Sequence, residues 1–203
     1  MSVTALVAVT AAAVLGCEAP SPPPGGGPSV STAPPVTAAP TTEETEPERN
    51  DTDYTHLLLA ASDISDAEDT FAVWSTTPDP GGLPGASALF VNAEDTRAIS
   101  NTIAIYPDAA TATTTLRQAL PGVGRVVTGG IPRPLPVGTD GTVVVGMSPD
   151  GTKAATLLLF THGPALARLQ FESAPGDATT DEYVATVGKM QLIALRTGLH
   201  EER

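Results

Sequence analysis

The stretch that decides the fold is VVVGMSPDGTKAATLLLF, residues 143–160. Two apolar runs flank the segment SPDG at 148–151, where proline fixes one central turn position and glycine supplies a left-handed residue. The pattern predicts two antiparallel strands joined by a tight turn. A second turn is expected at 161–164, and the alternation of apolar and polar residues over 165–172 is typical of a half-exposed strand. The second half of the chain is therefore expected to form a three-stranded antiparallel meander.

The first half of the chain carries the signals of further strands. Residues 87–92 and 98–106 are joined by the polar segment 94–96 and are expected to pair as a hairpin. Residues 70–75 predict another strand, which ends at an irregular loop containing two prolines and two glycines. The residues of this strand expected to be buried are Phe71, Val73 and Trp74.

Two amphipathic segments predict helices. The first begins at the capping residue Asp108 and runs to about Leu120. The second is capped by Thr179 or Thr180 and is expected to end at Gly198. The expected fold class is α+β, an antiparallel sheet made of a hairpin plus a three-stranded meander, with the two main helices packed on one face. This α+β domain is expected to span 54–203.

The N-terminus carries an export signal. Residues 3–15 are small or apolar and uncharged, a run too short to span a bilayer but typical of a signal peptide. The residues Val14, Leu15, Gly16 and Cys17 resemble the lipobox of bacterial lipoproteins, in which the cysteine is acylated (palmitate or a similar chain) after cleavage. The resemblance implies a signal peptide over 1–16 and lipidation at Cys17. The alternative is an apolar N-terminus with a chance cysteine.

Residues 17–53 are rich in proline, threonine and glycine and nearly lack large apolar side chains, so a disordered tether is expected. The tether contains seven acidic residues against Arg49, and the whole chain has a net charge of −13. Phosphate backbones would be repelled, which disfavours nucleic acid as a partner. Whether the threonines carry sugars is left open by composition.

The order of the motifs resembles a known family. Leu57-Leu58-Leu59 is followed by Tyr106–Ala110 opening a helix, the turn at 148–151 and a terminal helix. This arrangement is similar to exported actinobacterial lipoproteins of the cell envelope whose domain resembles the extracellular sensor domain of mycobacterial serine/threonine kinases. The resemblance covers 54–199 and implies binding or sensing in the envelope rather than catalysis. It implies no particular site residues.

Catalytic and metal-binding patterns are weak. Gly146–Asp150 begins like a nucleophile elbow, but Asp150 stands where the closing glycine should be and the stretch lies in a hairpin. The histidines are far apart in the sequence, and the acidic cluster at 63–69 is better explained by capping and solubility than by calcium. No catalytic residue, metal or cofactor is assigned, and the protein is not expected to be an enzyme.

Two residues in irregular segments are candidates for ligand binding. Trp74 precedes a proline- and glycine-rich loop, and Arg133 lies in a second such segment at 129–138. Loops on a rigid scaffold often carry binding residues. For Trp74 the simpler interpretation is a core anchor.

The sequence thus favours a membrane-anchored lipoprotein on the outer face of the cytoplasmic membrane or in the cell wall. Its exported domain is expected to bind or sense a small-molecule or lipid-like envelope ligand without catalysis. The alternative is a protein-interaction or scaffolding module that lacks a ligand cavity. A hollow between sheet and helices would favour the first hypothesis, and an exposed apolar patch the second.

Overall fold

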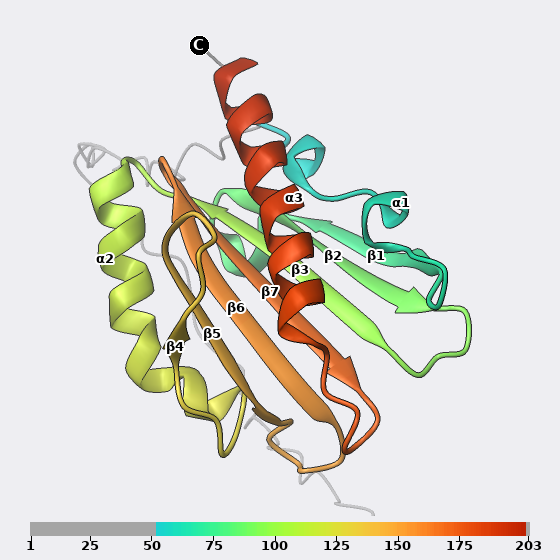
Figure 1. Cartoon of the computed structure of the whole chain (residues 1–203). Helices are drawn as coiled ribbons and strands as arrows, with labels where there is room; N and C mark the ends of the chain where they lie inside the picture. The colour runs from blue at the N-terminus through green and yellow to red at the C-terminus, as the bar shows by residue number, and fades with distance from the viewer. Residues whose placement is uncertain (1–51, 202–203) are drawn as a thin grey trace, which may run out of the picture. The chain divides into compact units, whose positions relative to one another are not determined.

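The computed structural model describes residues 52–201, with side chains to residue 199 (Figure 1). Within this range a single antiparallel sheet of seven strands has the order β1-β2-β3-β7-β6-β5-β4. Its strands are β1 Phe71–Pro78, β2 Gly85–Asn92, β3 Ala98–Ile105, β4 Arg133–Pro134, β5 Thr139–Met147, β6 Ala154–His162 and β7 Ala165–Ser173. The helices are α1 Ala61–Ile64, α2 Ala109–Ala119 and α3 Asp181–Glu201, with 3₁₀ turns η1 Thr55–Leu57, η2 Pro80–Gly82 and η3 Leu120–Arg125.

The expected α+β class, the hairpin and the meander are all present. β2 and β3 form the hairpin, and β5, β6 and β7 form the meander. Pairing between β3 and β7, from Ala98 opposite Glu172 to Ile105 opposite Ala165, joins the two parts into one sheet. The signal peptide at 1–16, with Cys17, and all but the last two residues of the tether at 17–53 lie outside the described residues.

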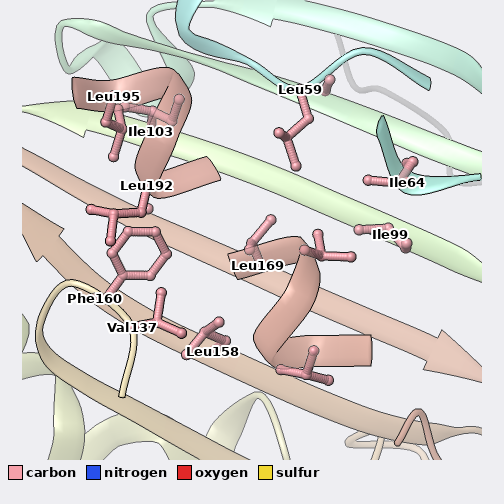
Figure 2. Close-up of a cluster of buried hydrophobic side chains, with 14 of the residues drawn as sticks. Leu59, Ile64, Ile99, Ile103, Val137, Leu158, Phe160, Leu169, Leu192 and Leu195 are labelled. Atoms are coloured by element: carbon pink, nitrogen blue, oxygen red, sulfur yellow. The ribbon is translucent and has the colours of Figure 1, made fainter. Parts of the chain in front are cut away.

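The expectation that both main helices pack on one face was wrong. In the interior strand β6, Leu157 belongs to a buried cluster with Leu116 of α2, whereas Leu158 and Phe160 belong to a second cluster with Leu195 of α3. Since adjacent strand residues point to opposite faces, α2 and α3 cover opposite faces of the sheet. Figure 2 shows the α3 side, where leucines from the helix lie over the side chains of the strands.

The turn at 148–151 is confirmed. The Ser148 amide donates to the carbonyl of Lys153 at 2.9 Å, and Gly151 has the left-handed φ of 71°. The Ser148 hydroxyl donates to Asp150 at 2.5 Å and accepts from the Lys153 amide at 3.0 Å. The Ser148 hydroxyl, followed by the amide and hydroxyl of Thr152, donates to the Asp150 carboxylate and lowers its pKa to about 2. Ser148 is thus held as a turn residue.

Both main helices begin where expected, but α3 does not end where expected. Asp108 accepts from the Thr111 amide at 2.7 Å and so caps α2, and the Thr180 hydroxyl accepts from the Tyr183 amide at 3.3 Å at the start of α3. Gly198 does not end α3, which continues to Glu201. A Cβ on Gly198 would lie 2.3 Å from Leu57 Cδ2, so this glycine allows close packing of η1 against the helix.

Candidate ligand site

A network of polar side chains lies at the end of the sheet where β1 begins. The Arg97 guanidinium, just before β3, pairs through Nε with Asp69 at 3.0 Å and through Nη2 with Asp177 at 2.5 Å. The buried amide of Asn92 donates to Asp69 at 2.7 Å and accepts from the backbone N–H groups of Thr96 and Arg97, both at 2.9 Å. Arg97 therefore links the segment before β1, the β2–β3 turn and the segment before α3.

A cavity of about 170 Å³ lies beside this network. Its apolar lining includes the buried side chains of Phe71, Ile99 and Phe171, contributed by β1, β3 and β7. The segment before α3 and the first turn of that helix complete the wall. The charged residues of the lining are Asp66, Glu68, Asp69, Arg97, Glu172 and Asp177.

Tyr183, on the first turn of α3, makes two contacts that fix its side chain. Its ring packs edge-on against Phe171, with ring centroids 6.2 Å apart. Its hydroxyl donates to the backbone carbonyl of Ile64. Burial, with smaller contributions from the negative charges of Asp66 and Asp69, raises the pKa of Tyr183 to about 12. The phenol therefore stays protonated and holds α3 against the end of α1.

The cavity has a negative electrostatic character. Two backbone amides, those of Glu68 and Asp69, donate to Asp66 at 2.8 Å each and lower the pKa of its carboxyl, so Asp66 stays ionised. The lining has five carboxylates and one guanidinium, and that guanidinium already serves two carboxylates. Lys153 adds one further cation by pairing with Glu172 at 3.0 Å. An anionic ligand would meet no free positive group in this lining.

A second hollow, of about 340 Å³, adjoins the first. Both hollows are lined by Asp66, Thr180 and Tyr183, so these three residues form a shared wall. The second hollow continues along α1 and α3 to Met190. Together they give a depression with apolar and acidic parts along the N-terminal half of α3.

The two residues proposed from the sequence as ligand contacts lie outside the cavity lining and are separated from each other. Trp74 is on β1 and Arg133 is on β4, the strands at the two opposite edges of the sheet. The interpretation of Trp74 as a core anchor was wrong, since its side chain is 75% exposed. The expected burial of Val73 was also wrong, since it is 52% exposed. The reason is that β1 is an edge strand in which Trp74, at a register shift, has no partner residue on β2. Arg133 pairs with Asp181 at the start of α3.

Sequence reasoning missed Arg97, Phe171 and Tyr183, and it assigned the acidic residues at 63–69 to capping and solubility. The signal that could have drawn attention to Arg97 is its place as the single cation directly after the acidic turn at 94–96. No local pattern connects it to Asp177, which is eighty positions later. Within residues 52–201 no three metal-ligating side chains converge.

Similarity to known proteins is found in the fold and not in the sequence. No protein-family model and no curated protein matches the sequence. The structure is similar to the extracellular domain of PknH from Mycobacterium tuberculosis, with a TM-score of 0.51 and 8% identity over 69% of this chain and 93% of that chain. This finding confirms, for the fold, the expected resemblance to extracellular domains of mycobacterial kinases. Lipidation and export remain predictions.

Proposed function

We propose that the chain is an exported lipoprotein, anchored through Cys17, whose domain binds a small or lipid-like ligand at the cavity beside Arg97 and performs no catalysis. The observation that carries this proposal is the cavity itself, a hollow with an aromatic and aliphatic floor and an acidic rim. Ligand sites are typically concave and furnished with a few placed polar groups. The alternative of a scaffold without a cavity is less well supported for this reason.

The lining also favours a ligand chemistry. Phe71, Ile99 and Phe171 form the apolar part of the lining. The carboxylates of the rim add attraction for a positive or hydrogen-bond-donating head group. We infer an amphipathic ligand with an apolar body and a cationic or donor-rich head. The hollow along α3 to Met190 gives room for a longer apolar part.

Native mass spectrometry of the full chain, purified from a lipid-producing bacterial host, tests the proposal. We expect a bound species of defined mass. Ala178→Trp, which places a large side chain in the cavity wall, should reduce its occupancy by about tenfold, equivalent to about 1.4 kcal/mol. Ala174→Trp is the matched control, because Ala174 is exposed on the same segment outside the lining. No bound species, or equal occupancy in the two variants, would contradict the proposal.

The membrane anchor needs a separate test. Among the described helices, none has the length and apolar character needed to cross a bilayer. The proposal places attachment on acyl chains at Cys17, and two or more such chains give a durable anchor. Labelled fatty acid should be incorporated into the chain and not into Cys17→Ala. Label on the alanine variant would contradict anchoring at this residue.

A further inference from the structure

The two edges of the sheet differ in how they are protected (Figure 1). β4 has only two residues, one of them Pro134, and its Arg133 is paired with Asp181. A short strand, a proline and a charge are the usual devices that prevent a sheet from adding further strands. β1 has eight residues, none of them charged, and its one proline, Pro78, is its last residue. In the described part of the chain no strand pairs with the outer edge of β1.

The outer edge of β1 also exposes apolar surface. Seven of its eight residues are exposed, including Val73 and Trp74. The extra residue at Trp74 is a β-bulge, since Val73 lies opposite Phe90 and Ser75 opposite Leu89. A bulge at an edge increases the local twist and redirects the side chain. In β1 it leaves a large aromatic side chain at the open edge of the sheet.

Acidic residues stand at both ends of this uncharged strand. Glu68 precedes β1 and Asp79 follows it, whereas Asp69, also before β1, is already paired with Arg97. The β2–β3 turn adds the exposed carboxylates of Glu94 and Asp95 near the start of β1, because Phe71 pairs with Asn92. An extended segment lying along β1 would therefore meet an uncharged middle and negative ends.

We propose that β1 binds an extended polypeptide segment of a partner protein as an eighth strand, and that this segment is apolar in its middle and carries lysine or arginine at its ends. Backbone hydrogen bonds along the open edge supply the general affinity, and side-chain contacts supply the specificity. A second copy of this chain fits less well. An antiparallel pair of β1 strands would bring Glu68 of one copy towards Asp79 of the other, which places like charges together. Binding at this edge does not depend on the cavity beside Arg97.

Trp74 is the only tryptophan of the chain, so its fluorescence reports directly on this edge. The probe is a ten-residue synthetic peptide with a valine–threonine centre and two lysines at each end, and the comparison peptide has glutamates in place of lysines. We expect a saturable blue shift with the lysine peptide and affinity about tenfold lower for the glutamate peptide. Raising the salt concentration should weaken binding of the lysine peptide.

Val73→Lys should weaken binding of the lysine peptide by about tenfold, since a charge on an edge strand opposes the addition of another strand. Ile131→Lys is the matched control, because Ile131 is an exposed apolar residue outside β1. Equal thermal unfolding midpoints of the two variants exclude misfolding as the cause. Ala178→Trp should bind the peptide normally, which separates this test from that of the cavity.

Four outcomes would overturn the proposal. One is the absence of a shift with either peptide. Two others are equal binding of both peptides and retention of binding by Val73→Lys. The fourth is protection from hydrogen exchange, before any peptide is added, of those β1 amides that donate neither to β2 nor to Ser65. Such protection would mean that a second copy or residues 17–53 already occupy the edge.

Discussion

The half of the sheet formed by β5, β6 and β7 and the half formed by β1, β2 and β3 are built differently. In the first half, β6 is buried along both faces between α2 and α3. In the second half, burial alternates along β2 and β3, and β1 is buried only at Phe71. Both halves contribute to the buried core, but only β6 is buried along nearly its whole length. The open edge belongs to the second half, and the cavity and the Arg97 network lie where that half meets β7 and the segment before α3.

Truncating a large aromatic residue in each half should give the sharpest contrast. Phe160→Ala removes a fully buried ring between β6 and α3 and should lower the free energy of unfolding by about 3 to 5 kcal/mol. Trp74→Ala, at an exposed position, should change it by less than about 0.5 kcal/mol. Chemical denaturation of both variants measures the two values. Similar losses would contradict the difference between the halves.

A buried polar chain ties the second half to α3. The Asn101 amide donates to Gln191 at 2.6 Å, and the Gln191 amide donates to the carbonyl of Leu57 at 2.8 Å. Gln191→Leu should cost about 2 to 4 kcal/mol, because two buried groups lose their partners. The double variant with Asn101→Leu should recover part of this loss. Denaturation of the single and double variants tests the coupling, and strictly additive losses would argue against it.

Close backbone packing in the first half can be tested with a glycine pair. A Cβ on Gly146 of β5 would lie 2.2 Å from the carbonyl oxygen of Thr128, so Gly146→Ala should cost about 2 to 3 kcal/mol. Gly124→Ala is the control, since a Cβ there meets no atom within 4 Å. Differential thermal unfolding of the two variants measures the contrast. A Gly146→Ala midpoint equal to that of the control would contradict the close approach of β5 to Thr128.

The smallest effect concerns the meander turn. The pKa of Asp150 is lowered from 3.8 to about 2, so its ionised form stabilises the folded state. This stabilisation is present above about pH 4 and is lost as the pH falls through about 2. Asp150→Asn should therefore be slightly less stable near neutral pH and should show a shallower acid dependence between about pH 4 and 2. A pH series of unfolding midpoints for both proteins measures it, and identical acid profiles would contradict the stabilising role of the Asp150 carboxylate.

The difference between the halves also explains what the sequence could predict. The meander was predictable because Pro149, Asp150 and Gly151 form its turn locally. The pairing of β3 with β7 was not, since it joins residues about seventy positions apart without a local signal. The placement of α2 and α3 on opposite faces does have a signal in the sequence. The apolar run of β6, interrupted before Phe160 only by Thr156, is typical of a strand buried on both faces.

The site was less predictable than the fold. Arg97, Asp177 and Tyr183 come from the end of a hairpin, a loop and a helix, and only the tertiary structure brings them to one cavity. Trp74 stands out in the sequence, but its exposure depends on β1 being the edge of the sheet. That position follows from the order of all seven strands and not from the residues around Trp74.

The most direct test of the central claim is NMR titration of the full chain with two small probes of matched shape, phenethylammonium and phenylpropionate. We predict saturable shifts at Ile99, Phe171 and Tyr183 with the ammonium probe and little change with the carboxylate. The response should be lost in Ala178→Trp but not in Ala174→Trp. Equal responses to both probes, or shifts confined to residues outside the cavity, would contradict a site for cationic amphipathic ligands beside Arg97.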